Sequence, residues 1–248
     1  MPDATPPSLT AAELAARIDH TILNADATPE AVAAVVDEAR SLGCASACVN
    51  PRYLAAAIEA LAGSTTVPCV VVAFPLGCNL PHTKSVEAVA AAKAGAAEID
   101  FVAHLPHLLD ADAEAATEDF LSVTRPAREV NPDVVVKVII ESACLMRDVS
   151  EDQAESRIAA ACRAAAESGC DFVKTSTGFH PAGGASVEAV RLMRSHAPHL
   201  RVKASGGIRT AADAARMLAA GADRLGCSAT RAILGEADTA AAGAGDAY

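Results

Sequence analysis

A phrase of similar composition recurs four times along this chain and fixes the order of its secondary structure. Each copy consists of an Ala-rich stretch, a glycine and a short apolar run, with the glycines at Gly43, Gly95, Gly169 and Gly221. A glycine between two such segments is typical of the left-handed residue that ends a helix. The repeat therefore predicts four helices that each lead directly into a strand, at about 45–50, 97–103, 170–174 and 223–226.

Four further apolar runs predict strands between these phrases, at Arg17–Leu23, Val67–Phe74, Val134–Ile140 and Leu200–Ser205. Eight strands then alternate with about eight helices, and no linker or low-complexity stretch divides them. This alternation over ~250 residues favours an α/β fold, a single-domain (β/α)8 TIM barrel. A doubly wound open sheet is the alternative, but the Gly-rich fingerprint that usually follows its first strand is missing.

Polar residues before the Ala-rich stretches predict where several helices begin. Thr28 precedes a proline and a glutamate, which gives an N-cap, a proline at the first helical position and an acidic first turn. Thr83 and Ser150 are expected as further caps. The barrel is expected over 11–235, between a disordered N-terminal segment at 1–10 and a flexible C-terminal tail at 236–248.

Charge and composition exclude several classes of protein. The net charge is −11 at pH 7 with a pI near 5.0, which argues against a nucleic-acid partner or an anionic membrane surface. No apolar run reaches the ~20 residues of a membrane span, and the N-terminus lacks a signal peptide's features, so we expect a cytoplasmic protein. The eight cysteines are scattered with no C-x-x-C pair, which favours small buried residues over a disulfide or zinc framework.

One predicted strand, in the segment Cys170–Phe179, carries a lysine on its inner face. Side chains alternate between the faces of a strand, so Lys174 points away from Val173 and from the helix that covers it. Burial pushes a lysine toward its neutral form, and a neutral amine can attack a carbonyl to form a Schiff base. The alternative is an ordinary strand-end lysine whose ammonium reaches solvent.

The same alternation turns further polar side chains toward Lys174 from other strands. They are Lys203, Lys137, Asp100, Asp19 and Cys48. Chemistry in a (β/α)8 barrel takes place at the carboxyl ends of the strands, where these groups converge. The convergence predicts a catalytic site, and the alternative is a buried ion-pair network that only fixes the register of the strands.

Aldol chemistry accounts for this set of residues. A free lysine has a pKa of about 10.4, and lowering it by about three units destabilises the ammonium by roughly 4 kcal/mol. The ammonium of Lys203 and partial desolvation can supply this effect at Lys174. Asp100 can then move protons, while Lys137 holds Asp100 ionised or binds a substrate hydroxyl. An iminium on Lys174 is the electron sink that cleavage of a carbon–carbon bond needs, so no metal and no cofactor are expected.

Glycine-rich turns after the last strands predict a phosphate site. Backbone N–H groups at such turns, together with helix N-termini, bind phosphate where TIM barrels commonly hold it. The candidate residues are Ser205, Gly206 and Gly207 after one strand, Gly226 and Ser228 after the next, and Gly178 after the Lys174 strand, with Gly183 and Gly184 as possible additions. The alternative for any one Gly-Gly pair is a tight loop without a ligand.

Seven short motifs spread along nearly the whole chain carry a resemblance to a known family. They are Ile18-Asp19-His20-Thr21, Cys48-Val49-Asn50-Pro51, Phe74-Pro75-Leu76-Gly77, Glu98-Ile99-Asp100, Val136-Lys137-Val138-Ile139-Ile140-Glu141, Phe172-Val173-Lys174-Thr175-Ser176-Thr177-Gly178-Phe179 and Val202-Lys203-Ala204-Ser205-Gly206-Gly207-Ile208-Arg209. In these motifs the chain resembles the deoxyribose-phosphate aldolase family.

The resemblance implies a class I aldolase on a (β/α)8 barrel that cleaves 2-deoxy-D-ribose 5-phosphate to D-glyceraldehyde 3-phosphate and acetaldehyde, in deoxyribose phosphate catabolism. It implies Lys174 as the Schiff-base residue and Asp100 and Lys203 as proton donors or acceptors. It also implies phosphate contacts from the turns at 206–207 and 226–228, and a mobile tail whose terminal Tyr248 reaches the site.

Some positions depart from the family pattern. His104 stands where the family usually has Asn, and is expected as a hydrogen-bonded rim residue. Cys227 and Ala229 stand where small or hydroxylic residues are common. Cys48 matches a family cysteine near the aldehyde site, which predicts a side reaction with unsaturated aldehydes if its thiolate is accessible, and a small core residue if it is not.

Three other functions stay open from the sequence. A Schiff-base aldolase for a keto-deoxy sugar acid would use the same lysine, but needs a cation for the substrate carboxylate. A phosphosugar-binding protein would keep the glycine turns without catalysis, and an isomerase would use a carboxylate base and no imine. The expected partners are small phosphosugars and aldehydes, with no nucleic acid and no membrane; an Ala-rich outer ring of helices is compatible with a homodimer.

Overall fold

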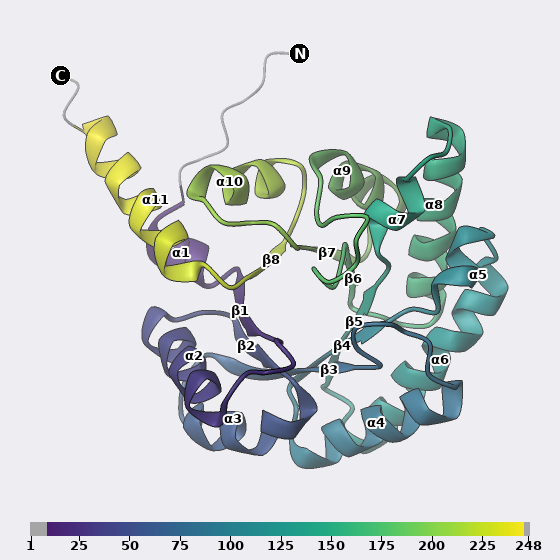
Figure 1. Cartoon of the computed structure of the whole chain (residues 1–248), viewed down its shortest axis with the longest axis horizontal. Helices are drawn as coiled ribbons and strands as arrows, with labels where there is room; N and C mark the ends of the chain where they lie inside the picture. Colours follow the sequence, from purple (N-terminus) through teal and green to yellow (C-terminus); the bar gives the residue numbers. More distant parts are fainter. Residues whose placement is uncertain (1–8, 246–248) are drawn as a thin grey trace.

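The chain folds into a closed barrel of parallel strands surrounded by helices (Figure 1). The structure, a computed structural model, describes residues 9–245. Each strand pairs with the next in the sequence and β8 pairs with β1, which confirms the predicted (β/α)8 barrel and excludes the open sheet. The strands are β1 (Ile18–Ile22), β2 (Ser46–Val49), β3 (Val67–Val72), β4 (Glu98–Val102), β5 (Val135–Ile139), β6 (Phe172–Lys174), β7 (Arg201–Ser205) and β8 (Arg224–Cys227).

Helices form the outer layer and follow the strands in order. They are α1 (Ala11–Ala15), α2 (Pro29–Leu42), the 3-10 turn η1 (Pro51–Tyr53), α3 (Leu54–Ala60), α4 (Pro81–Ala94), α5 (Leu105–Leu109), α6 (Ala113–Val130), α7 (Ser142–Met146), α8 (Glu151–Glu167), α9 (Val187–His196), α10 (Ala211–Ala219) and α11 (Thr230–Gly245). None of the helices in the described part of the chain combines the length and the apolar character that a bilayer-spanning segment requires.

The local signals explain most helix ends. All four glycines of the repeated phrase have positive φ, between 70° and 109°, where a side chain would be strained. Thr28 and Ser150 cap α2 and α8 through their hydroxyl oxygens, as predicted. The prediction for Thr83 is wrong: α4 begins at Pro81, because a proline at the first helical position is a start signal of its own, and Thr83 lies inside the first turn.

Two segments at the ends of the chain differ from the expected boundaries or escape description. The expected flexible tail starts at 236, whereas α11 continues to Gly245 through a run of alanines, the residue with the highest helix propensity. Residues 1–8 and 246–248, including Tyr248, lie outside the described residues.

The core lies between the strands and the helices and is aliphatic. Outward-facing residues such as Ile99, Val136 and Val173 are fully buried against alanine-rich helix faces, which allow close packing. Inside the barrel the apolar residues form a separate small cluster of Leu23, Cys48, Cys69 and Val71. The rest of the interior carries charged side chains, and these build the site.

Candidate active site

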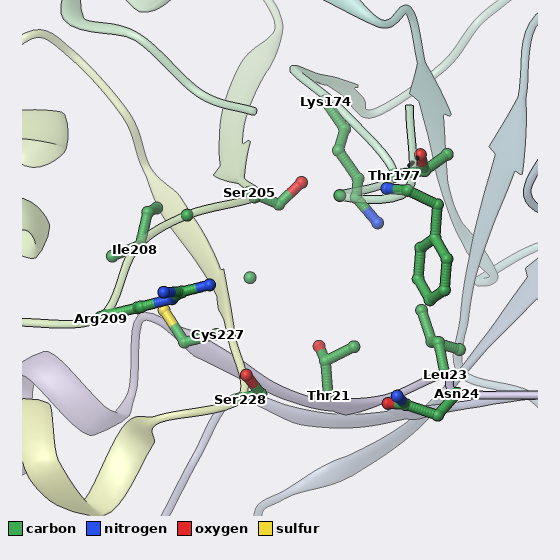
Figure 2. A pocket seen from close by; sticks show the side chains of 15 residues that line it. Thr21, Leu23, Asn24, Lys174, Thr177, Ser205, Ile208, Arg209, Cys227 and Ser228 are labelled. Carbon is green, nitrogen blue, oxygen red and sulfur yellow. Dashed lines mark hydrogen bonds between the residues drawn. The ribbon is translucent and has the colours of Figure 1, made fainter. Parts of the chain in front are cut away.

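A cavity of about 210 Å³ opens at the carboxyl ends of β1, β6, β7 and β8 (Figure 2). Lys174 points into it from the end of β6, and Arg209 reaches into it from the loop after β7. The six residues predicted to bind phosphate all line the same cavity: Gly178, Ser205, Gly206, Gly207, Gly226 and Ser228. The structure thus brings the predicted nucleophile and the predicted phosphate turns to one place.

Lys174 and Lys203 share one carboxylate oxygen. Their Cα atoms are partners in the register of β6 and β7, so both side chains point into the barrel side by side. The Lys174 Nζ lies 2.7 Å from Asp100 Oδ2, and the Lys203 Nζ lies 2.6 Å from the same oxygen. Lys174 is 3% exposed and the other two are fully buried, so the substrate cavity reaches this cluster through Lys174.

The second oxygen of Asp100 is held from β5 and β3. Lys137 Nζ donates to Asp100 Oδ1 over 2.7 Å, and the Cys69 thiol donates to it over 3.3 Å. Burial alone would raise the pKa of Asp100, but the ammonium groups of Lys137, Lys174 and Lys203 outweigh it and hold this pKa well below its usual range. Lys137 therefore lies where it keeps Asp100 ionised.

Lys203 is anchored by two carboxylates. Its Nζ contacts both Asp19 Oδ2 and Asp100 Oδ2. Burial works to lower the pKa of Lys203, but Asp100 and Asp19 outweigh it and raise this pKa above its ordinary value. Lys203 thus stays a cation beside Lys174, which is the electrostatic neighbour that the sequence predicts.

Two charged residues that the sequence analysis did not predict as site residues, Glu98 and Arg224, lie at the amino ends of β4 and β8. This end of the barrel, opposite the cavity, is called the closed end below. Glu98 Oε2 lies 2.5 Å from Lys137 Nζ, and Arg224 Nη1 lies 2.5 Å from Asp19 Oδ1 and 3.3 Å from Glu98 Oε1. The Phe172 ring lies at the same end, with the Arg201 guanidinium 4.0 Å and the Arg224 guanidinium 5.5 Å from its centroid. Alternation could have found Glu98 and Arg224, because each lies two residues before an inward-facing residue of its own strand, Asp100 or Gly226.

The interior charges are unequally paired. Among the described groups of this cluster, four cations (Lys137, Lys174, Lys203 and Arg224) face three carboxylates (Asp19, Glu98 and Asp100). Lys137, Lys203 and Arg224 each contact two or more of the carboxylates, whereas Lys174 contacts Asp100 alone and shares its oxygen. Among these four cations, Lys174 is therefore the one with a single carboxylate partner.

Glycines shape the phosphate end of the cavity. Gly206 and Gly207 have φ of 91° and 84°, which turns the backbone after β7 into the cavity. A Cβ on Gly226 would lie 2.8 Å from Ser205 Cβ and 3.3 Å from Lys203 Cε, so this glycine leaves room for the lysine. Arg209 was not predicted as a site residue, although its position directly after the Gly-Gly turn is the signal that could have found it.

The loop after β6 is held from behind by two contacts outside the cavity. Thr177 N donates to Glu141 Oε1 over 2.7 Å, and Glu141 is buried with a left-handed backbone, φ 50°. Gly184 packs on Gly206, since a Cβ at Gly184 would lie 2.2 Å from the Gly206 carbonyl oxygen. Contrary to the sequence expectation, neither Gly183 nor Gly184 lines the cavity; Gly184 instead brings the loop after β6 against the loop after β7.

Cys48 and His104 lie away from the cavity. Cys48 is fully buried beneath it, so the accessible thiolate that the side reaction would need is absent from the described structure. His104 precedes α5, its ring contacts the His107 ring with centroids 4.7 Å apart, and its backbone N–H donates to Asp119 Oδ2. Burial, and then the neighbouring His107, lower the pKa of His104.

One group of described side chains has the spacing of metal ligands. The ligand atoms of Cys48, Cys69 and Asp100 lie within 4.8 Å of one another. Lys137 lies 3.5 Å from Cys69 Sγ and 2.7 Å from Asp100, so its ammonium opposes a further cation at this place.

A closed (β/α)8 barrel with a buried lysine–carboxylate cluster beneath a cavity at its carboxyl end defines the chain as a TIM-barrel enzyme. The family model described as DeoC/LacD family aldolase matches residues 14–236, and the chain belongs to this family of carbon–carbon lyases. The resemblance to the deoxyribose-phosphate aldolases is thus confirmed.

Individual relatives carry that family's name. The deoxyribose-phosphate aldolase of Mycobacterium tuberculosis is 48% identical over 206 residues, 83% of this chain and 87% of the relative. That of Mycolicibacterium paratuberculosis is 47% identical over the same length, covering 88% of the relative. The tetrameric deoxyribose phosphate aldolase of Aeropyrum pernix is similar in structure, with a TM-score of 0.82 at 32% identity, covering 93% of each chain.

Proposed function

We propose that this chain is a class I aldolase that reversibly cleaves 2-deoxy-D-ribose 5-phosphate to D-glyceraldehyde 3-phosphate and acetaldehyde through a Schiff base on Lys174. The observation that carries the proposal is the position of Lys174, which lines the cavity and donates to Asp100 Oδ2, the same oxygen to which Lys203 donates. The names of relatives that match 83% of the chain support the choice of substrate.

In the proposed reaction, the neutral amine of Lys174 attacks the C1 aldehyde of the open-chain sugar, and loss of water gives an iminium. The iminium draws the electrons of the C2–C3 bond as the C3 hydroxyl gives up its proton, which releases glyceraldehyde 3-phosphate and leaves an enamine. Protonation at C2 and hydrolysis then release acetaldehyde. Asp100 and Lys203 carry these protons, because they are the titratable groups in contact with each other and, through Asp100, with Lys174.

The phosphate of the substrate binds at the opposite side of the cavity. The N–H groups of the Gly206-Gly207 turn and of the turn at 226–228 supply donors, with Gly178 and the Ser205 and Ser228 hydroxyls beside them. Arg209 adds the local cation that an acidic protein of net charge −11 needs to attract an anion. A substrate of this kind places the chain in the breakdown of deoxyribose phosphates.

Arg209 also bears on the aldolase for keto-deoxy sugar acids, which needs a cation for the substrate carboxylate. A guanidinium in the cavity meets that need. It stands beside the Gly-Gly turn and not beside Lys174, however, and this position fits a terminal phosphate far from the carbonyl better than a carboxylate next to it.

Reductive trapping tests the proposal. The protein is incubated with 2-deoxyribose 5-phosphate and borohydride, and its peptides are mapped by mass; a stable adduct is expected on Lys174, in the presence of chelator as well. Lys174→Met is expected to give no adduct and to lose at least ~10³-fold in kcat, with an unchanged circular dichroism spectrum. An adduct on another lysine, or normal turnover by Lys174→Met, would refute the proposal.

A further inference from the structure

Two charged residues occupy the closed end of the barrel, opposite the cavity. The side chains of Glu98 on β4 and Arg224 on β8 are 7% and 13% exposed, and neither residue lines the cavity. They contact each other over 3.3 Å. Nothing in the proposed reaction requires a substrate contact from this end, yet a buried charge pair is costly to keep without a role.

Each member of the pair reaches Lys174 through a short chain of ion pairs. Glu98 binds Lys137 over 2.5 Å, Lys137 binds Asp100 over 2.7 Å, and Asp100 binds Lys174 over 2.7 Å. On the other side, Arg224 binds Asp19, Asp19 binds Lys203, and Lys203 binds Asp100 over 2.6 Å. Both chains end on the carboxylate that holds Lys174.

Charged groups surround Lys174 on several strands of the barrel. The charged and titratable groups of the described residues in this cluster and in the cavity beside Lys174 are Asp19 on β1, Cys48 on β2, Cys69 on β3, Glu98 and Asp100 on β4, Lys137 on β5, Lys203 on β7, Arg224 and Cys227 on β8, and Arg209 in the loop after β7. Because Asp19, Asp100, Lys137 and Lys203 are fully buried, their charges interact more strongly than charges in solvent. Removal of one charge at Glu98 or Arg224 therefore changes the electrostatic potential at Lys174.

We infer that Glu98 and Arg224 are positioning residues that set the protonation of Lys174 from the closed end of the barrel, and so set the pH range in which it acts as a nucleophile. The inference rests on the proposed function, since it takes Lys174 as that nucleophile. The two residues have opposite effects on the protonation of Lys174. Loss of the Glu98 charge disfavours the ammonium of Lys174, whereas loss of the Arg224 charge favours it.

The test compares four proteins: the wild type, Glu98→Gln, Arg224→Met and the double variant. Lys174 reactivity is followed as a function of pH in two ways, by cyanoborohydride trapping with acetaldehyde and by competitive acylation with acetic anhydride. Glu98→Gln is expected to move the midpoint to lower pH by about half a unit or more, and Arg224→Met to move it to higher pH by a similar amount. The double variant, with the two charge changes cancelling, is expected near the wild type.

The controls separate charge from structure. Arg224→Lys keeps the charge and is expected to keep the wild-type midpoint. Midpoints that stay fixed, or that move in one direction in both single variants, would overturn the inference, as would a double variant more perturbed than either single one. If one single variant fails to fold, the direction in which the midpoint of the other variant moves still tests the inference.

The acylation readout keeps this inference distinct from the proposed function. Shifted acylation midpoints without any trapped adduct in the wild type would support the tuning of Lys174 and refute its role as a Schiff-base residue. A trapped adduct in the wild type, with unshifted acylation midpoints in both variants, would support the Schiff-base role of Lys174 and refute its tuning by Glu98 and Arg224.

Discussion

At the scale of single residues, Lys203 combines two tasks. It is fully buried, it neutralises Asp19 and Asp100 together, and its charge lies beside Lys174. Removal of one partner from a buried ion pair leaves the other charges uncompensated, which is more costly than loss of the whole pair. The residue therefore matters for stability as well as for chemistry.

Lys203→Leu is expected to lower kcat by at least ~10²-fold. Lys174 loses the neighbouring cation, and Asp100 loses the hydrogen-bonded ammonium with which it exchanges protons in the proposed reaction. It is also expected to lower the free energy of unfolding by about 3 kcal/mol. Steady-state kinetics and urea unfolding measure the two effects. Lys93→Leu, on the exposed face of α4, is the matched control and should change stability by less than about 0.5 kcal/mol. Turnover by Lys203→Leu within a few-fold of the wild type would contradict the argument.

Alternation along the strands predicted the interior residues well, because a period of two leaves only one choice of face. It predicts one cluster of Lys174, Lys203, Lys137 and Asp100, and their ion pairs confirm it. The buried Lys84 shows where such reasoning stops. On a helix it would be taken for a surface residue, and its partner Asp119, 2.8 Å from its Nζ, lies 35 positions along the chain.

At the scale of elements, start and stop signals located the strands with ends that differ by no more than two residues. The glycine that ends a helix is a local signal, so it could be read from the sequence. The start of α4 was misplaced because two local signals competed and the proline prevailed. The contact between the loops of β6 and β7 is a tertiary one, and no local pattern distinguishes Gly184, which packs on Gly206, from a glycine that lines the cavity.

Gly184→Ala tests whether this contact shapes the phosphate end of the cavity. Its Cβ would meet the Gly206 carbonyl oxygen at 2.2 Å and push apart two loops that line the cavity. We expect a loss of about 1–3 kcal/mol in the free energy of unfolding and a KM for 2-deoxyribose 5-phosphate raised more than the KM for unphosphorylated 2-deoxyribose.

Gly43→Ala is the control for this variant. Gly43 has φ +70° and a Cβ there would meet nothing within 4 Å, so the substitution strains the backbone at the end of α2 without a collision. It should cost about 1 kcal/mol in stability and leave both KM values unchanged. Equal effects of the two variants on KM would show that the loop contact does not shape the site.

At the scale of the whole molecule, the barrel places its apolar packing and its charged site in different layers. The apolar core lies outside the strands, between them and the helices, while the interior is occupied by ion pairs. The fold therefore keeps its apolar packing even though the space that many barrels fill with aliphatic side chains carries charge. The dependence of stability on pH should then report the interior ion pairs.

Asp19 gives this dependence its clearest test. Burial would raise its pKa, but Lys203, Lys137 and Arg224 outweigh burial and lower it from the ordinary value of 3.8. Because the folded-state pKa is depressed, its contribution is complete above about pH 4, where the unfolded chain is also ionised, and is lost as the pH falls further and the unfolded chain takes up the proton first. Lys203 is protonated in both states in this range, since its folded-state pKa is raised, and adds no slope.

The free energy of unfolding of the wild type is therefore expected to decrease as the pH is lowered from 4. For Asp19→Asn, the slope of the free energy of unfolding against pH is expected to be smaller by up to about 1.4 kcal/mol per pH unit. Urea unfolding from pH 7 to pH 3 measures both slopes. Asp26→Asn, at an exposed position before α2, is the control and should leave the wild-type slope unchanged. Parallel curves for the wild type and Asp19→Asn would mean that Asp19 has no depressed pKa in the folded protein, and the ion pairs beneath Lys174 would then have to be assigned differently, with Asp19 no longer the carboxylate that anchors Lys203.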